Sequence, residues 1–287
     1  MTMIRKILFP VDFSASCEAM APYVRRAMTI LSAKVTLLYV LENSTSSFEL
    51  WVRPVPDAEK DRETIAQTKL NSFLASEFPV QECSRLLLTG DAASQISKAV
   101  MEGGFDLIIM PTHTGAFRRM LLGSTTAKVL DEADCPVLTT QHAETLSPRR
   151  VEHREWVCAL GLNEDSARIL QFAKGIAEDA HVNLTLVHAI PASKAGSPIQ
   201  LNLGQRKQPA HQKAVSQRIE QLQESVGSHA RVVIADGPLK DTLTEAAHRL
   251  QADVLVIGRS PQPGTLGRLR DLSYAITRDA PCPVLSV

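Results

Sequence analysis

The chain has 287 residues, of which 44% are hydrophobic and 22% charged, and its 31 Lys and Arg residues balance its 31 Asp and Glu residues. A net charge of zero argues against a dedicated binder of nucleic acid or anionic membranes, and an aromatic content of 5% leaves few platforms for stacking bases. No apolar run approaches the ~20 residues that span a bilayer, and the five scattered cysteines form no C-x-x-C pair. We therefore expect a soluble, cytoplasmic protein without nucleic-acid or membrane partners.

Short aliphatic runs alternate with helical patterns along the first half of the chain. Near-continuous apolar strands separated by helices are typical of a parallel sheet that is covered on both faces. The first half is therefore predicted to be a flavodoxin-like, doubly wound α/β domain with five parallel strands, and its ligand crevice should lie at the carboxyl ends of the strands. The expected strands are residues 6–11, 34–40, 84–89, 105–110 and 135–140, and the expected helices are residues 14–33, 58–77, 92–101 and 123–132.

The same plan is repeated in the second half of the chain. The segment "ADCPVLTT" returns as "APCPVLSV", which places Cys135 and Cys282 147 positions apart, and Asp106 and Asp253 have the same separation. A constant offset that is interrupted only by small insertions indicates duplication of a whole domain. The sequence therefore predicts two tandem α/β domains, residues 1–145 and 154–287, joined by a polar linker at residues 146–153.

Two segments at the ends of expected strands carry a family resemblance. "ILFPVDFSASCEAM" contains most of the first strand and puts Asp12 just past its end. "IIMPTHTGAFRRMLLGSTTAKVLDEADCPVLTT" runs from the end of the fourth strand through the fifth. The order P-V-D-x-S, then G-S with A-K-V-L, then C-P-V-L resembles the universal stress protein family. The resemblance covers nearly the whole chain twice, so the chain is identified as a tandem member with an adenine nucleotide alpha hydrolase-like fold.

The resemblance implies a regulatory module, usually dimeric through its last strand, that binds an adenine nucleotide or none and has no established turnover chemistry. In ATP-binding members the loop after strand 4 reads G-x2-G-x9-G-[ST], and its glycines let backbone amides approach the phosphates. The aspartate after strand 1 contacts the nucleoside, and the residue that ends strand 2 offers its backbone to adenine. Carried over to this chain, the positions for ATP with Mg²⁺ are Pro10, Val11, Asp12, Val40, Met110, Pro111, His113, Gly123, Ser124 and Thr125.

The first half departs from this pattern in its late loop. Pro111 replaces the first glycine and has no N–H to offer a phosphate, Thr114 replaces the second, and the gap to Gly123 is one residue short. Asp12 has two readings, ligand contact and capping of the first helix, and the sequence leaves both open. His113 has no positioned partner in the sequence and is read as polar lining, so no catalytic residue is assigned.

The second half departs further. Aligning the first strands at an offset of about 150 puts Leu162 at the position of Asp12, and counting back from the final C-P-V puts Arg270 and Asp271 at the positions of Gly123 and Ser124. A carboxylate at a helix start repels phosphate. We therefore expect this half to be a degenerate site that does not bind ATP.

The sequence thus predicts a non-catalytic stress-response module with an ATP site in the N-terminal domain only. The alternative is an interaction module that needs no nucleotide. Slow ATP hydrolysis is a remote third reading, because neither a Walker G-x4-G-K-[ST] loop nor an S-G-G-x-D-S loop is present. The two final strands are expected to pair within one chain as a pseudo-dimer, and dimerisation of whole chains stays open.

Overall fold

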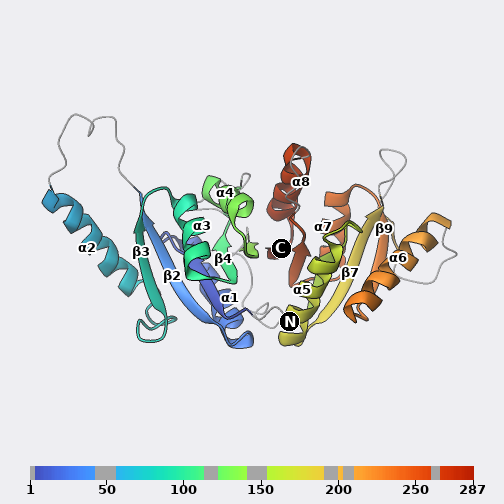
Figure 1. Ribbon diagram of the computed structural model, residues 1–287, viewed down its shortest axis with the longest axis horizontal. Coiled ribbons are helices and arrows are strands. Elements are labelled where there is room, and N and C mark those ends of the chain that lie inside the picture. The colour runs from blue at the N-terminus through green and yellow to red at the C-terminus, as the bar shows by residue number, and fades with distance from the viewer. Residues whose placement is uncertain are drawn as a thin grey trace. The chain divides into compact units, whose positions relative to one another are not determined.

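The computed structural model describes residues 4–42, 56–112, 122–140, 154–190, 200–202, 210–259 and 266–287, with backbone alone at residues 56–59, 200–202, 210–211 and 266–271. Its described residues divide into two compact units, one formed by residues 4–137 and the other by the described residues from 138 to 287. Both units alternate strands and helices, as the sequence predicts (Figure 1).

The described residues of the first half form five strands and four helices. Its strands lie in the order β3-β2-β1-β4-β5, and the registers show that β1 pairs in parallel with both β2 and β4. The helices α2 and α3 lie on opposite sides of β3 in Figure 1, so both faces of the sheet are covered. The elements are β1 (Lys6–Pro10), α1 (Ala15–Ile30), β2 (Lys34–Leu41), α2 (Pro56–Ser72), β3 (Ser84–Thr89), α3 (Ala92–Gly103), β4 (Leu107–Pro111), α4 (Ser124–Glu132) and β5 (Val137–Thr140).

The second half repeats this plan with one addition. Its strands lie in the order β11-β10-β6-β7-β9-β8, and the short β8 pairs antiparallel with β9. The prediction of five parallel strands is therefore correct for the parallel part of this sheet and missed the sixth, antiparallel strand, which covers the open edge of β9. The elements are β6 (Glu155–Ala159), α5 (Ser166–Asp179), β7 (Asn183–Ile190), β8 (Gln200–Asn202), α6 (Ala210–Val226), β9 (Arg231–Asp236), α7 (Leu239–Arg249), β10 (Val254–Ile257), α8 (Leu266–Asp279) and β11 (Val284–Ser286).

Burial follows the apolar runs of the sequence. β4 and β10 are buried at every residue, and β1 is buried after its first residue. A strand that is buried on both faces needs apolar side chains at successive positions and not in alternation, which explains the continuous runs. Cys135 and Cys282, at the turn into the last strand of each half, are also buried.

The duplication is visible in hydrogen bonds as well as in sequence. Asp106 precedes β4, and its Oδ2 accepts hydrogen bonds from the backbone N–H groups of Arg5 (2.8 Å) and Lys6 (2.9 Å) at the start of β1. Asp253, 147 positions later, binds the two N–H groups at the start of β6 in the same way. One carboxylate thus fixes the register between the two central strands of each sheet.

The strand ends that face the crevice also correspond between the halves. Val11 N donates to Leu38 O at 2.8 Å in the first half, and Leu160 N donates to Val187 O at 2.9 Å in the second. Leu160 and Val187 each lie 149 positions after their counterparts Val11 and Leu38. These bonds mark where the first strand of each sheet separates from the second, which opens the crevice.

Candidate functional site

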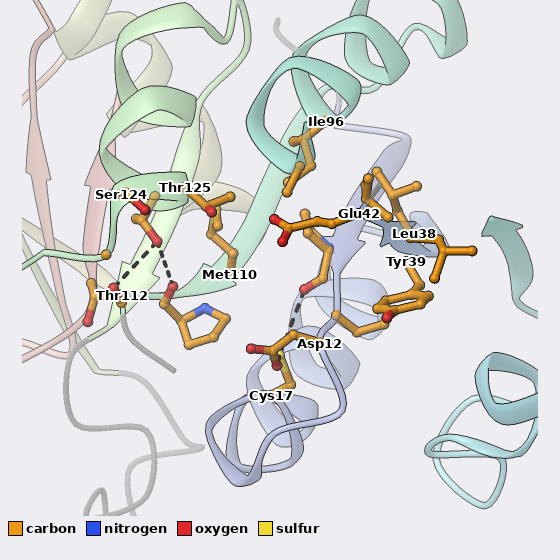
Figure 2. Close-up of a pocket in the computed structure, with 18 of the residues that line it drawn as sticks. Asp12, Cys17, Leu38, Tyr39, Glu42, Ile96, Met110, Thr112, Ser124 and Thr125 are labelled. Atoms are coloured by element: carbon orange, nitrogen blue, oxygen red, sulfur yellow. Dashed lines mark hydrogen bonds between the residues drawn. The ribbon is translucent and has the colours of Figure 1, made fainter. Parts of the chain in front are cut away.

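A pocket of about 460 Å³ lies at the carboxyl ends of β1, β2 and β4, beside the start of α4 (Figure 2). Its size is within the range usual for small-molecule sites, and its place at the point where the strand order reverses is where doubly wound sheets bind ligands. Nine of the ten positions carried over from the family pattern line it: Pro10, Val11, Asp12, Val40, Met110, Pro111, Gly123, Ser124 and Thr125. The tenth, His113, lies outside the described residues, as does the rest of the loop through residue 121.

The turn after β1 projects Asp12 toward the pocket. Ser14 is the N-cap of α1, because its side chain accepts a hydrogen bond from Cys17 N at 3.3 Å. Asp12 instead uses Oδ1 to accept bonds from Ser14 N (3.0 Å) and from the Cys17 thiol (3.0 Å). Capping of the helix therefore falls to Ser14, and Asp12 is left as an exposed carboxylate on the pocket wall.

Between these residues, Phe13 has a φ of 63°, a left-handed conformation that is uncommon for a bulky side chain. The ring is held against Tyr39 at a centroid distance of 4.4 Å and against Phe73 at 5.2 Å, and the Lys69 ammonium lies 4.4 Å from its centroid. These contacts, from β2, from α2 and from the residue that follows α2, hold a backbone kink that turns the chain back into α1. The kink is what places Asp12 and Cys17 next to each other.

Val40 contributes its backbone to the pocket. The pairing of β1 with β2 ends at Pro10 and Leu38, whereas β2 continues to Leu41 on β3 alone. Gly90 N bonds Leu41 O on the β3 side, and successive residues of a parallel strand direct their N–H and C=O groups to opposite neighbours. The N–H and C=O of Val40 therefore point to the side that β1 has left, where they can bind the edge of a planar base.

The start of α4 is fixed close to the end of β4. Gly123 N donates to Thr112 O at 2.9 Å, and a Cβ at Gly123 would lie 2.9 Å from the same oxygen, so only glycine fits without a shift. The Thr126 hydroxyl donates to Pro111 O (3.2 Å) and Thr112 O (3.4 Å), shown as dashed lines in Figure 2.

Gly123, the N-cap residue of α4, has no side chain that could cap the helix, and the first turn contains no acidic residue. The first N–H groups of a helix have no intrahelical acceptor and carry a partial positive charge, so this end of the pocket suits an anion such as phosphate. Ser124 and Thr125 add two hydroxyl groups at the same place.

Several lining residues were missed by the sequence reading. Tyr39 and Glu42 come from β2 and its end, Ile96 from α3, Arg62 from α2 and Cys17 from α1. In Figure 2 the Glu42 carboxylate points into the pocket, between Ile96 and Met110. The alternation of side chains along β2 could have indicated which of its residues face the pocket. No local sequence pattern shows that α2 and α3 contribute to the same cavity.

The thiol at the base of the pocket is held in its neutral form. Burial, with a further contribution from the negative charge of Asp12, raises the pKa of Cys17 to about 12. Within the described ranges, no group of three or more His, Cys, Asp or Glu side chains is arranged to hold a metal ion. None of the described helices is long and apolar enough to cross a membrane.

In the second half, the position that corresponds to Asp12 carries no carboxylate. Leu162 has a φ of 54° and therefore matches Phe13, with its φ of 63°, at an offset of 149. The assignment of Leu162 to the position of Asp12 was therefore wrong by one residue. The left-handed residue and the strand register both give an offset of 149, whereas the sequence alignment used the spacing of residues in the first helix, which gives about 150. Gly161 occupies that position, so no side chain is present there.

In the second crevice, side chains of the same domain form hydrogen bonds with two backbone carbonyl groups. His188, at the position of Tyr39, places Nδ1 2.8 Å from Leu160 O, and Arg218 donates to Leu162 O at 3.1 Å. A carbonyl accepts and does not donate, so Nδ1 must carry the proton of this imidazole.

The late loop of the second half also differs from expectation. α8 ends at Asp279, matching the end of α4, but begins at Leu266, five positions before the residue that matches Ser124. Arg270 and Asp271 therefore lie inside a helix and not at its start, which corrects the prediction of a carboxylate at the helix start. Their N–H groups belong to the helical ladder, so they are not available to a phosphate.

Comparison with known proteins agrees with this architecture. The model of the universal stress protein family matches residues 3–141 and again residues 154–287. The chain belongs to the universal stress protein family. It carries two tandem domains of the family, which confirms the resemblance predicted from the sequence.

The relatives of this universal stress protein fall into single-domain and longer chains. Universal stress protein MJ0577 of Methanocaldococcus jannaschii is 26% identical over 158 residues, which are 48% of this chain and 96% of that protein. Universal stress protein Slr1230 of Synechocystis is 31% identical over 137 residues, 47% of this chain and 42% of that protein. The crystal structure of a universal stress protein from Archaeoglobus fulgidus matches with a TM-score of 0.72 at 19% identity, covering 98% of this chain and 97% of that one, and shows the shared fold.

Proposed function

We propose that the N-terminal domain binds ATP or a related adenine nucleotide and that the C-terminal domain binds none. The proposal rests on one observation: three groups that can bind different parts of a nucleotide lie in the same pocket. They are the carboxylate of Asp12, the outward-facing backbone of Val40 and the start of α4, whose N-cap residue Gly123 has no side chain. A nucleoside phosphate needs these three elements, for its ribose, its base and its phosphates respectively.

The apolar walls support this orientation of the ligand. The base would lie among Val40, Ile96 and Met110, all of which are buried, and its edge would bind the Val40 backbone. The exposed Glu42 side chain, which points between Ile96 and Met110, would turn out of this space when the base binds. The phosphates would meet the N–H groups at the start of α4 and the hydroxyls of Ser124 and Thr125. Any Mg²⁺ would enter with the phosphates, because the described residues at that end, Ser124 and Thr125, offer hydroxyl ligands.

We assign the chain a regulatory, non-catalytic role in the stress response, in the cytoplasm. The proposed organisation is residues 1–145 as the nucleotide-binding domain, residues 146–153 as linker and residues 154–287 as a domain with a degenerate site. The absence of a side chain at Gly161, together with the self-bound carbonyls at Leu160 and Leu162, supports the lack of a nucleotide site in the second domain.

We further propose that the two final strands pair within one chain as a pseudo-dimer. Each final strand, β5 and β11, stands at the edge of its own domain's strand order, and an edge strand exposes unpaired backbone groups that favour pairing. A cysteine pair introduced by Leu138→Cys and Leu285→Cys should then form an intramolecular disulfide. Formation of intermolecular disulfides alone would favour whole-chain homodimers, and no disulfide would refute the pairing.

The nucleotide site is tested by mass spectrometry of small molecules released from freshly purified full-length protein, and by calorimetric titration with ATP and Mg²⁺. Asp12→Ala should weaken ATP binding by roughly tenfold, the effect of about 1.4 kcal/mol, because a hydrogen bond to a charged group is lost. Asp165→Ala removes a carboxylate from the corresponding loop of the second domain and should leave the affinity unchanged.

The alternatives give different results in the same experiments. Absence of any released nucleotide, together with no thermal shift in saturating ATP and Mg²⁺, would refute the proposal and favour a nucleotide-independent interaction module. Steady release of ADP by the wild-type protein, abolished by Asp12→Ala, would favour slow hydrolysis.

A further inference from the structure

Cys17 lies directly behind the carboxylate that faces the pocket. It is in the first turn of α1, is 2% exposed, and lines the pocket at its base (Figure 2). Its Sγ is 3.0 Å from Asp12 Oδ1. This distance is at the short end for a thiol donor, as expected when the acceptor is an ionised carboxylate.

We propose that Cys17 is a positioning residue for ligand recognition: its thiol holds Asp12 in the rotamer that presents Oδ2 to a ribose diol. This inference rests on the proposed nucleotide site and adds a residue to it. The ligand class that depends on Cys17 is then a nucleotide with free 2′- and 3′-hydroxyl groups.

The geometry of the carboxylate supports this role. Oδ1 accepts from both Ser14 N (3.0 Å) and the Cys17 thiol (3.0 Å), and two donors on one oxygen fix the plane of the carboxylate. The other oxygen is then directed to the open side, where Figure 2 shows Asp12 facing the cavity. With a single donor the group could turn about its Cβ–Cγ bond, and the directed contact would be lost for part of the time.

The chemistry of the thiol suits a permanent donor. Burial and the charge of Asp12 raise the pKa of Cys17 to about 12, so the thiol keeps its proton at every physiological pH. The thiolate is the reactive form of cysteine, so this residue is also protected from oxidation. Because the side chain is 2% exposed, little water reaches the sulfur to compete for the hydrogen bond.

A role in core packing alone makes a different prediction. Alanine and serine both shrink the side chain, but only serine retains a donor near Oδ1. If Cys17 only fills space, the two variants should behave alike. If it positions Asp12, serine should rescue binding and alanine should not.

The test is calorimetric titration of the full-length protein with ATP and with 2′,3′-dideoxy-ATP, each with Mg²⁺. Cys17→Ala should weaken ATP binding by roughly five- to tenfold, as expected for a lost bond to a charged group, and change dideoxy-ATP binding by less than about twofold. Cys17→Ser should bind ATP within about twofold of wild type. Equal losses for both variants, or equal losses for both ligands, would overturn the inference.

A second measurement needs no ligand and separates this inference from the nucleotide proposal. The infrared S–H stretching band of Cys17 is isolated by subtracting the spectrum of Cys17→Ala from that of wild type. Asp12→Ala should move this band to higher frequency, since a hydrogen bond weakens the S–H bond. An unmoved band overturns the positioning role even if ATP binds. A moved band, with no ATP binding by the wild-type protein, overturns the nucleotide site and confirms only the hydrogen bond from Cys17 to Asp12.

Discussion

The anchoring of α4 to β4 gives the sharpest test of how the phosphate end of the pocket is built. Thr126→Val removes one hydroxyl and retains the branched shape of the side chain. The hydroxyl donates to Pro111 O (3.2 Å) and Thr112 O (3.4 Å), and Thr126 is 3% exposed. The net contribution of one hydrogen bond to stability is roughly 0.5–1.5 kcal/mol, and the buried carbonyl groups that lose a donor add to the loss. The free energy of unfolding should therefore fall by about 1–2 kcal/mol.

The measurement is urea unfolding followed by circular dichroism, with ATP affinity determined on the same samples. Thr125→Val is the matched control, because Thr125 lies one residue earlier, is only half-buried and lines the pocket. It should cost less than about 0.5 kcal/mol of stability and still weaken ATP binding. Equal stability losses for the two variants, or no loss for Thr126→Val, would refute the assignment of Thr126 as the anchor.

Three further predictions concern stability. Asp106→Ala and Asp253→Ala each leave two N–H groups without their carboxylate at the start of a central strand, so each should lower the free energy of unfolding in urea by about 1–2 kcal/mol; an effect in only one half would contradict the equivalence of the repeats. Gly175→Ala, in the middle of α5 where a Cβ meets no atom within 4 Å, should stabilise the protein by about 0.5–1 kcal/mol in the same assay, and a destabilised variant would show that the site is crowded. Hydrogen bonds from Arg278 lower the pKa of Asp279 to about 2, so its stabilising contribution is complete above the unfolded-state pKa near 4 and is lost as the pH falls toward 2. With the side chain 31% exposed, Asp279→Asn should cost about 1 kcal/mol at pH 7, and the difference from wild type should close between pH 4 and 2; a difference that persists at pH 2 would exclude this ion pair as the cause.

The sequence was a good guide where the cause of structure is local. Apolar runs of about five residues separated by helical patterns predict buried parallel strands, and β1 and β4 lie where those runs are. Because the carboxyl ends of parallel strands meet at one edge of the sheet, residues as distant as Asp12 and Gly123 were expected in one site, and the structure brings both to the pocket. Whether that site holds a nucleotide stays a prediction.

The tertiary structure decided what depends on backbone conformation and on contacts between distant elements. Phe13, which has a left-handed backbone, is held by aromatic contacts with Tyr39 of β2 and with Phe73 just after α2, and it shows that Gly161 and not Leu162 is the equivalent of Asp12 in the second repeat. The early start of α8 places Asp271 inside a helix, a difference that residue counting from the last strand cannot reveal. The sequence by itself determined the fold class, because local patterns of apolar residues predict buried strands and helices. It also determined the duplication, because similar segments recur at a constant offset. The kink after β1 and the thiol of Cys17 behind the carboxylate arise only when side chains from separate elements meet.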